Sequence, residues 1–211
     1  LFRSPATHAG GAWRDVGVRP PTGVVEKTVE KGIAPKSEVG IVFTGPFVYD
    51  RAHRVAIRAM ALVLQGRLFD TIRQELGGTY SIEAEEFTRK YPQPTFTVRI
   101  GWTCDPERTA SLVERVFQEI RFVQATTLNA SQMTRIRAAM LRNAEQAGED
   151  NSYLLNEIVR AYQEGDADQL AAALDPTEAI ATLTSEAIQD DARTYLNEQN
   201  YVKVVLMPET K

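Results

Sequence analysis

Five stretches of the chain alternate apolar and polar residues with the period of two that is typical of half-buried β-strands. These stretches are residues 24–31, 38–47, 80–85, 96–103 and 201–207. The first is rich in charged residues, which is typical of an edge strand. Residues 89–94, with two prolines, separate the third stretch from the fourth, and we therefore predict a hairpin there.

Longer stretches place apolar residues three and four positions apart and predict helices. They cover residues 51–76, 105–123, 129–148, 151–164 and 184–196, with one or two further turns after residue 175. The expected N-caps are Asp50, Asp105, Asn129 and Thr184, because these side chains accept hydrogen bonds from the free amides of a first turn. Gly165 is expected to end the helix over 151–164.

The helix faces predict which residues are buried. Between Val55 and Leu64 only Arg58 is polar, so the first helix is expected to be buried around most of its circumference. In the second helix, Glu119 is expected to point outward. The apolar side of the fourth helix consists of Leu154, Leu155, Ile158, Val159 and Tyr162.

The element order predicts an α+β fold with an antiparallel sheet and helices packed on one of its faces. Two strands, a long helix, a hairpin, several helices and a last strand follow one another without regular alternation of strand and helix. Prolines and glycines are concentrated before residue 47. We expect residues 1–23 to form an extended N-terminal arm and residues 24–211 to form a single domain.

Composition and charge exclude several classes of function. The chain has 211 residues, with 24 Lys and Arg against 28 Asp and Glu, and this net charge of −4 argues against nucleic-acid binding. The longest apolar run, Ala59 to Leu64, has six residues, far below the roughly 20 of a transmembrane helix. The chain begins at Leu1 without the features of a signal peptide, so we interpret it as a piece of a longer or processed protein.

Histidine and cysteine are too scarce for a self-sufficient metal or nucleophile site. A catalytic zinc takes three protein ligands, and the two histidines, His8 and His53, lie far apart in the sequence. Asp50 and His53 have the spacing of one helix face, but two ligands rarely suffice. Cys104 has no histidine placed in sequence as its base, so we interpret it as a small buried thiol. We therefore predict no catalytic residue and no metal ligand in this chain.

Residues 68–81 contain the best candidate for a binding site. They place Arg73 in the last turn of the first helix and Tyr80 at the start of the next strand, with Gly77 and Gly78 between them. Arginine and tyrosine can both donate to a carbonyl oxygen or a developing oxyanion of a peptide. The alternative is structural, since a cation is favourable at a helix C-terminus and Tyr80 can be a core residue with its hydroxyl in water.

The same segment resembles the non-catalytic C-terminal half-domain of the bacterial members of the pitrilysin and insulinase type of zinc metallopeptidase. The Arg73, six residues, Tyr80 spacing carries most of the resemblance, and further likeness is found in residues 15–25, 31–37, 43–47 and 104–108. The resemblance implies one half of a clamshell that encloses a peptide. It also implies that Arg73 and Tyr80 bind the substrate opposite a zinc held by the other half.

No His-x-x-Glu-His motif occurs in this chain, so zinc and the general base are expected in a catalytic half of the same polypeptide or in a partner subunit. We expect a domain that is inactive alone and closes the chamber. The alternative is a catalytically inactive scaffold or peptide-binding subunit of the same fold. The resemblance suggests the bacterial periplasm, with the cytoplasm as the alternative compartment.

Two charged groups remain. Glu83, Glu85 and Glu86 are expected to form an acidic strand face opposite Arg99, with solvated cross-strand pairs or, on the resemblance, part of a chamber wall. Arg135, Arg137 and Arg142 are expected on the wet side of the helix over 129–148.

Overall fold

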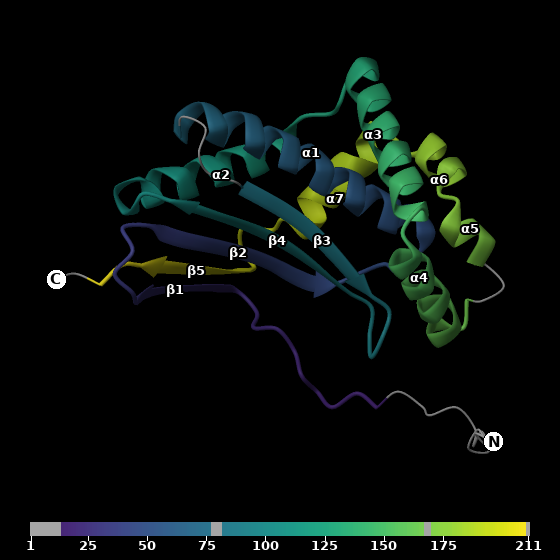
Figure 1. The fold of residues 1–211 in the computed structure, drawn as a ribbon, viewed down its shortest axis with the longest axis horizontal. Helices are drawn as coiled ribbons and strands as arrows, with labels where there is room; N and C mark the ends of the chain where they lie inside the picture. The colour runs from purple at the N-terminus through teal and green to yellow at the C-terminus, as the bar shows by residue number, and fades with distance from the viewer. Residues whose placement is uncertain (1–13, 77–81, 167–169, 210–211) are drawn as a thin grey trace.

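The fold is a five-stranded sheet with its helices on one side, as the computed structural model shows for residues 14–76, 82–166 and 170–209 (Figure 1). The strand order is β1-β5-β2-β4-β3. The strands are β1 (Val24–Glu30), β2 (Ser37–Pro46), β3 (Ile82–Arg89), β4 (Thr95–Cys104) and β5 (Tyr201–Met207). The predicted α+β class and the hairpin are confirmed.

The sheet is mixed, which the sequence does not predict. Strands β2, β3, β4 and β5 pair in antiparallel fashion, but β1 runs parallel to β5 at the edge, with Val24 opposite Tyr201. Lys203 of β5 bridges to Glu26 of β1 at 2.9 Å, and the Tyr201 hydroxyl donates to the same carboxylate. The first and last strands of the fold therefore pair at one side of the sheet, and side chains of β5 satisfy the Glu26 carboxylate of the polar edge strand β1.

The helices form two groups. Helices α1 (Arg51–Leu76), α2 (Thr109–Ala125) and α7 (Ser185–Tyr195) cover the sheet, and a short 3₁₀ turn (Pro106–Arg108) precedes α2. Helices α3 (Ala130–Gly148), α4 (Asn151–Glu164), α5 (Leu170–Leu174) and α6 (Thr177–Thr182) gather beside the end of the sheet where β2 leads into α1 (Figure 1).

The core lies between the sheet and α1. Alternate residues of β2 and β4 are buried on the helix-covered side, and α1 buries residues along most of its length, as its apolar sequence predicts. The largest fully buried side chains include Phe43, Ile41, Ile57, Met60, Leu64, Leu68 and Ile100. This packing fixes the axis of α1, whose C-terminal end carries the predicted binding residue Arg73.

Most of the predicted helix ends are confirmed. The Asp50 carboxylate accepts from the His53 amide at 2.8 Å, Asn129 forms a reciprocal capping box with Gln132, and Thr184 accepts from the Ala187 amide. Asp105 is the exception, because its side chain makes no capping hydrogen bond and the chain enters α2 through the 3₁₀ turn. Gly165 ends α4 with a left-handed φ of 76°.

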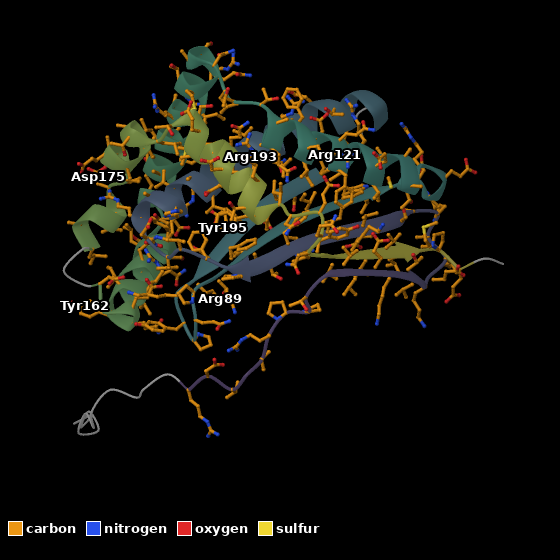
Figure 2. The ribbon with its side chains drawn as sticks, turned by 180° about the vertical axis from the view of Figure 1, so that it is seen from behind. Arg89, Arg121, Tyr162, Asp175, Arg193 and Tyr195 are labelled. Carbon is orange, nitrogen blue, oxygen red and sulfur yellow. The ribbon has the colours of Figure 1, made fainter. Side chains whose placement is uncertain are left out.

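The apolar side of α4 lies largely at the surface. Leu155, Ile158, Val159 and Tyr162 are exposed, and Ala161 is the residue of α4 that is buried. Figure 2 shows Tyr162 pointing away from the body of the protein. The reason is positional, because α4 sits beside the sheet rather than on it. Among the described residues, no helix is both long and apolar enough to span a membrane.

Candidate functional site

The predicted pair Arg73 and Tyr80 falls at the junction between α1 and β3. The backbone of Arg73 belongs to the last turn of α1, which ends at Leu76, and β3 begins at Ile82. The side chain of Arg73 and the whole of Tyr80 lie outside the described residues. Their shared contact with a substrate therefore stays a prediction, and the structure defines the framework around them.

Gln65 joins α1 to the start of β3, about two turns before Arg73. Its amide nitrogen donates to the Ile82 carbonyl at 2.8 Å, and its amide oxygen accepts from the Ala84 amide at 2.5 Å. These main-chain groups belong to an edge strand and have no neighbouring strand on that side. The Gln65 side chain makes the hydrogen bonds that such a strand would otherwise make. The strand that follows Tyr80 is thereby held against the helix that carries Arg73.

A buried carboxylate holds the same end of α1 to α2. Glu119 is only 3% exposed, and it bridges to Arg67 at 2.6 Å and to Arg115 at 3.3 Å while accepting from the Thr71 hydroxyl at 3.2 Å. The Arg67 guanidinium also lies 3.5 Å from the centre of the Phe122 ring. The expectation that Glu119 points outward is wrong, because Arg67 and Thr71 of α1 and Arg115 of α2 satisfy its oxygens in the interior.

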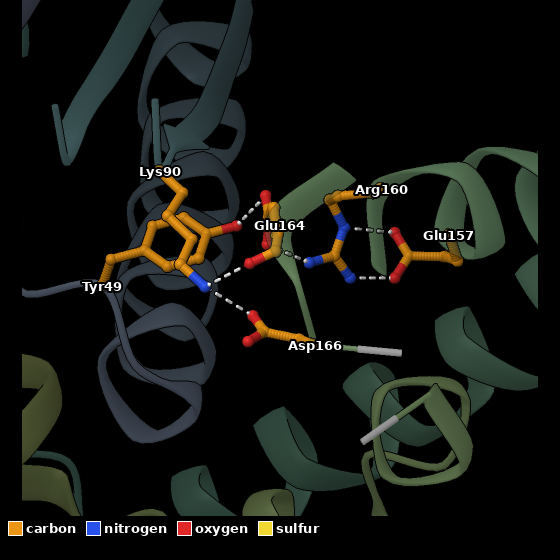
Figure 3. A network of polar contacts seen from close by, with 6 residues as sticks. All are labelled: Tyr49, Lys90, Glu157, Arg160, Glu164 and Asp166. Atoms are coloured by element: carbon orange, nitrogen blue, oxygen red, sulfur yellow. Dashed lines mark hydrogen bonds and ion pairs between the residues drawn. The ribbon is translucent and has the colours of Figure 1, made fainter. Parts of the chain in front are cut away.

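A second polar network fastens α4 to the hairpin (Figure 3). The Tyr49 hydroxyl donates to Glu164 at 2.8 Å, and the Lys90 amine donates to the Glu164 carbonyl at 2.9 Å and to Asp166 at 2.8 Å. Arg160 pairs with both Glu157 and Glu164. Burial and the Glu164 carboxylate raise the pKa of Tyr49, so its hydroxyl remains a donor at neutral pH.

The other nucleophile and metal candidates have structural roles here. Cys104 is buried at the end of β4, with its sulfur 3.2 Å from the Ser37 hydroxyl. Asp50 caps α1, and its second oxygen lies 2.8 Å from Nδ1 of His53. Within the described part of the chain, no three His, Cys, Asp or Glu side chains form a group that could hold a metal ion. These residues do not fit a zinc site.

Asp191 of α7 is a buried acid that the sequence pattern does not reveal. Burial, opposed by His53 and assisted by Asp190 and Asp50, raises the pKa of its carboxyl to about 7. Its Oδ2 atom has no hydrogen-bond partner among the described residues. The carboxyl therefore titrates near neutral pH and its ionised form is disfavoured in the folded protein.

The two charged groups of the sequence analysis differ in their surroundings. Glu83, Glu85 and Arg99 line a shallow hollow of about 180 Å³ on the uncovered face of the sheet, with Glu85 directly opposite Arg99. The expectation that Glu86 shares this face is wrong, because its position in β3 turns it to the helix-covered side, where it pairs with Arg58 at 3.1 Å. Arg137 does not lie on the wet side of α3, because its guanidinium is half-buried and donates to the Leu183 carbonyl at 2.5 Å. It ties α3 to the segment before α7.

Sequence reasoning overlooked Gln65 and Glu119, the two polar residues that anchor this end of α1. For Glu119, the available signal was its position in the sequence. Glu119 falls three residues after Val116 and four before Val123, inside the buried stripe of α2. A polar residue in an apolar stripe indicates a buried partner for it.

Comparison with known proteins gives one curated relative and several solved structures. The chain is 26% identical over 161 residues to a zinc protease PQQL-like protein of Arabidopsis thaliana, a match that covers 70% of this chain and 17% of the relative. Its fold is similar to the periplasmic protease PqqL from Escherichia coli, with a TM-score of 0.75 and 19% identity over 98% of this chain and 22% of the other.

It is also similar to the ferredoxin protease FusC in complex with Arabidopsis ferredoxin, with a TM-score of 0.73 and 14% identity. That match covers 90% of this chain and 21% of FusC. The chain thus spans less than a quarter of the length of each of these three proteins. At these identities the structural matches establish the fold. The sequence profile of the peptidase M16 inactive domain matches residues 4–140, more than half of the chain, and the chain therefore belongs to the peptidase M16 inactive domain family.

Proposed function

We propose that this chain is the non-catalytic domain that closes the peptide chamber of a zinc metallopeptidase and contacts the substrate through Arg73 and Tyr80. Its membership of an inactive-domain family is the observation that carries the proposal. The chain would be inactive alone. Zinc and the general base would come from a catalytic half of the same polypeptide or from a partner subunit, as the zinc protease relative suggests.

The framework of the α1–β3 junction supports a substrate role for this pair. Gln65 and Glu119 fix the end of α1 from two sides, so the helix turn that carries Arg73 has a rigid base. Rigid support is what a donor needs to stabilise a developing oxyanion without reorganising during the reaction. The same pair would orient the peptide carbonyl next to the scissile bond.

The test is turnover of a peptide substrate by the assembled enzyme. Arg73→Ala is expected to lower kcat by roughly 10²–10³-fold, as for the loss of an oxyanion donor. Tyr80→Phe, which keeps the ring, is expected to lower activity with little change in melting temperature. Arg142→Ala on the exposed side of α3 is the matched control and should leave kcat unchanged. Near-normal turnover of a well-folded Arg73→Ala enzyme would refute the role.

The alternative is a catalytically inactive scaffold or peptide-binding subunit of the same fold. The absence of a metal-binding group among the described residues is compatible with this function as well. Sequencing the native polypeptide and its obligate partners decides between the two, because the peptidase requires a zinc motif in one of them. We also propose a periplasmic compartment, on the similarity to the periplasmic protease PqqL, to be tested by cell fractionation.

A further inference from the structure

Strand β3 has a free edge. It is the last strand of the sheet, and its pairing with β4 is continuous from Ile82 opposite Trp102 to Arg89 opposite Thr95. In such a regular antiparallel pair, alternate residues turn both main-chain groups away from the partner strand. The Gln65 contacts show that Ile82 and Ala84 belong to the outward set, so Glu86 and Thr88 belong to it too.

The outward main-chain groups at the two ends of β3 differ in whether they have a hydrogen-bond partner. Gln65 satisfies the Ile82 carbonyl and the Ala84 amide, as described above. The main-chain groups of Glu86 and Thr88 have no such partner among the residues that the structure describes. An unpaired row of amides and carbonyls is a template for one more strand. The site for such a strand is therefore the second half of β3.

A groove with an excess of arginine runs beside this edge. Two adjoining cavities of about 320 and 400 Å³ lie between β3, α1 and the neighbouring helices, and Val55, Arg58, Glu86, Tyr153 and Pro176 line both. The cavity next to Thr88 is lined by five arginines and only two glutamates. The arginines are Arg51, Arg54, Arg58, Arg89 and Arg160.

Three of these arginines have no carboxylate partner among the described residues, and one of the three, Arg51, donates to the Asp175 carbonyl at 2.6 Å. Arg58 is paired with Glu86, and Arg160 is paired with Glu157 and Glu164. Arg54 and Arg89 form no ion pair with any described residue, and the buried Nε of Arg54 has no hydrogen-bond partner there. The Arg54 guanidinium lies 5.3 Å from the Tyr49 ring centre, which holds it at the groove wall. A carboxylate of a bound molecule would form the ion pair that each of these two arginines lacks.

We propose that the free edge of β3 binds an acidic, extended peptide segment as a sixth strand, with its carboxylates in the arginine-lined groove. The peptide main chain pairs with Glu86 and Thr88, and every second side chain points toward Arg54 on the helix-covered side of the sheet. Arg89, at the end of β3, flanks the same groove from the other face of the strand. An extended peptide fits because its side-chain period of two matches the alternation along β3. Thr88 lies six residues after Ile82, roughly 20 Å along β3, so this site lies at the other end of the strand from the α1–β3 junction.

The test is binding of a fluorescein-labelled octapeptide of alternating glutamate and threonine to the 211-residue chain, followed by fluorescence anisotropy. Thr88→Pro removes the outward amide without removing a sheet hydrogen bond, and proline is tolerated there because the amide faces away from β4. It is expected to weaken binding about 3- to 10-fold, as for one or two hydrogen bonds. Thr88→Val keeps the amide and should bind like the wild type.

The charge component is tested by Arg54→Gln combined with Arg89→Gln. This variant is expected to weaken binding of the glutamate peptide about tenfold and to reduce its salt dependence, because the attraction of exposed charges is screened by salt. A matching lysine and threonine octapeptide should not bind. A glutamate peptide with N-methyl groups at alternate residues should bind as weakly to the wild type as the parent peptide binds to Thr88→Pro.

The outcomes separate this proposal from the role of Arg73. Arg73→Ala should leave peptide anisotropy unchanged, whatever it does to turnover in the assembled enzyme. If Thr88→Pro is folded by circular dichroism and binds the peptide as well as Thr88→Val, strand addition is refuted. Equal binding of the glutamate and lysine peptides would refute the role of the arginines.

Discussion

Helices α1 and α4 differ in what their apolar side chains contact. In α1, Ile57, Leu64 and Ile72 are fully buried between the sheet and the other helices. In α4, Leu155 and Tyr162 are 60% and 71% exposed, although they recur with the same helical spacing. The comparison teaches that an amphipathic pattern identifies a face that can be buried. Whether it is buried depends on a neighbouring surface, which the apolar residues of α1 have in the sheet and which Leu155 and Tyr162 of α4 lack among the described elements.

The largest expected effect on stability comes from truncating a buried side chain in the core between α1 and the sheet. Leu64→Ala is expected to lower the free energy of unfolding by about 2–5 kcal/mol, because a fully buried leucine loses its contacts and leaves a cavity. Urea unfolding of the chain, followed by circular dichroism, measures this change. A loss below about 1 kcal/mol would mean that α1 is not packed against the sheet in solution, and the contrast with α4 would disappear.

A smaller effect is expected from the buried acid that packs beside the start of α1. The folded state raises the pKa of Asp191 to about 7 from an unfolded value near 3.8, so between these values the folded protein binds more protons than the unfolded chain. The free energy of unfolding therefore falls as the pH rises through this range and levels off above it. Asp191→Asn has no carboxyl at this position and lacks this contribution.

The measurement is urea unfolding of wild type and Asp191→Asn at several pH values. The stability of the variant relative to the wild type is expected to increase by about 1–3 kcal/mol between about pH 4 and pH 8, which reflects the raised pKa after allowance for incomplete burial. The comparison of the two proteins cancels the titration of distant groups. A relative stability that does not change with pH would show that Asp191 is solvated in the folded state.

The sequence predicts the parts of the fold that depend on local pattern. The bounds of α1 and β5, the hairpin, and the caps at Asp50, Asn129 and Thr184 follow from periodicity and side-chain chemistry within a few residues. The parallel pairing of β1 with β5 does not, because it joins residues nearly 180 positions apart. The exposure of the α4 face does not follow either, since it depends on where the helix is placed.

The candidate sites also differ in whether a local sequence pattern or long-range packing brings their residues together. The Arg73 and Tyr80 spacing is a local pattern and can be recognised in the sequence, although those side chains lie outside the described residues. The groove at β3 collects Arg54 from α1, Arg89 from β3 and Tyr153 from α4, and no sequence pattern connects them. Gln65 was equally hidden, because its role as a substitute strand depends on the approach of α1 to the sheet edge.

The smallest expected effect on stability comes from truncating an exposed leucine of α4, for comparison with the buried leucine of α1. Leu155→Ala is the same change as Leu64→Ala and also lies in a helix, but Leu155 is 60% exposed. We expect it to change the free energy of unfolding by less than about 0.5 kcal/mol, because little apolar area is lost and alanine favours the helix slightly more than leucine. A loss above about 1.5 kcal/mol would contradict the exposed position of α4. Repeating the unfolding at tenfold lower protein concentration would then show whether a second copy covers Leu155, because only association makes such a loss depend on concentration.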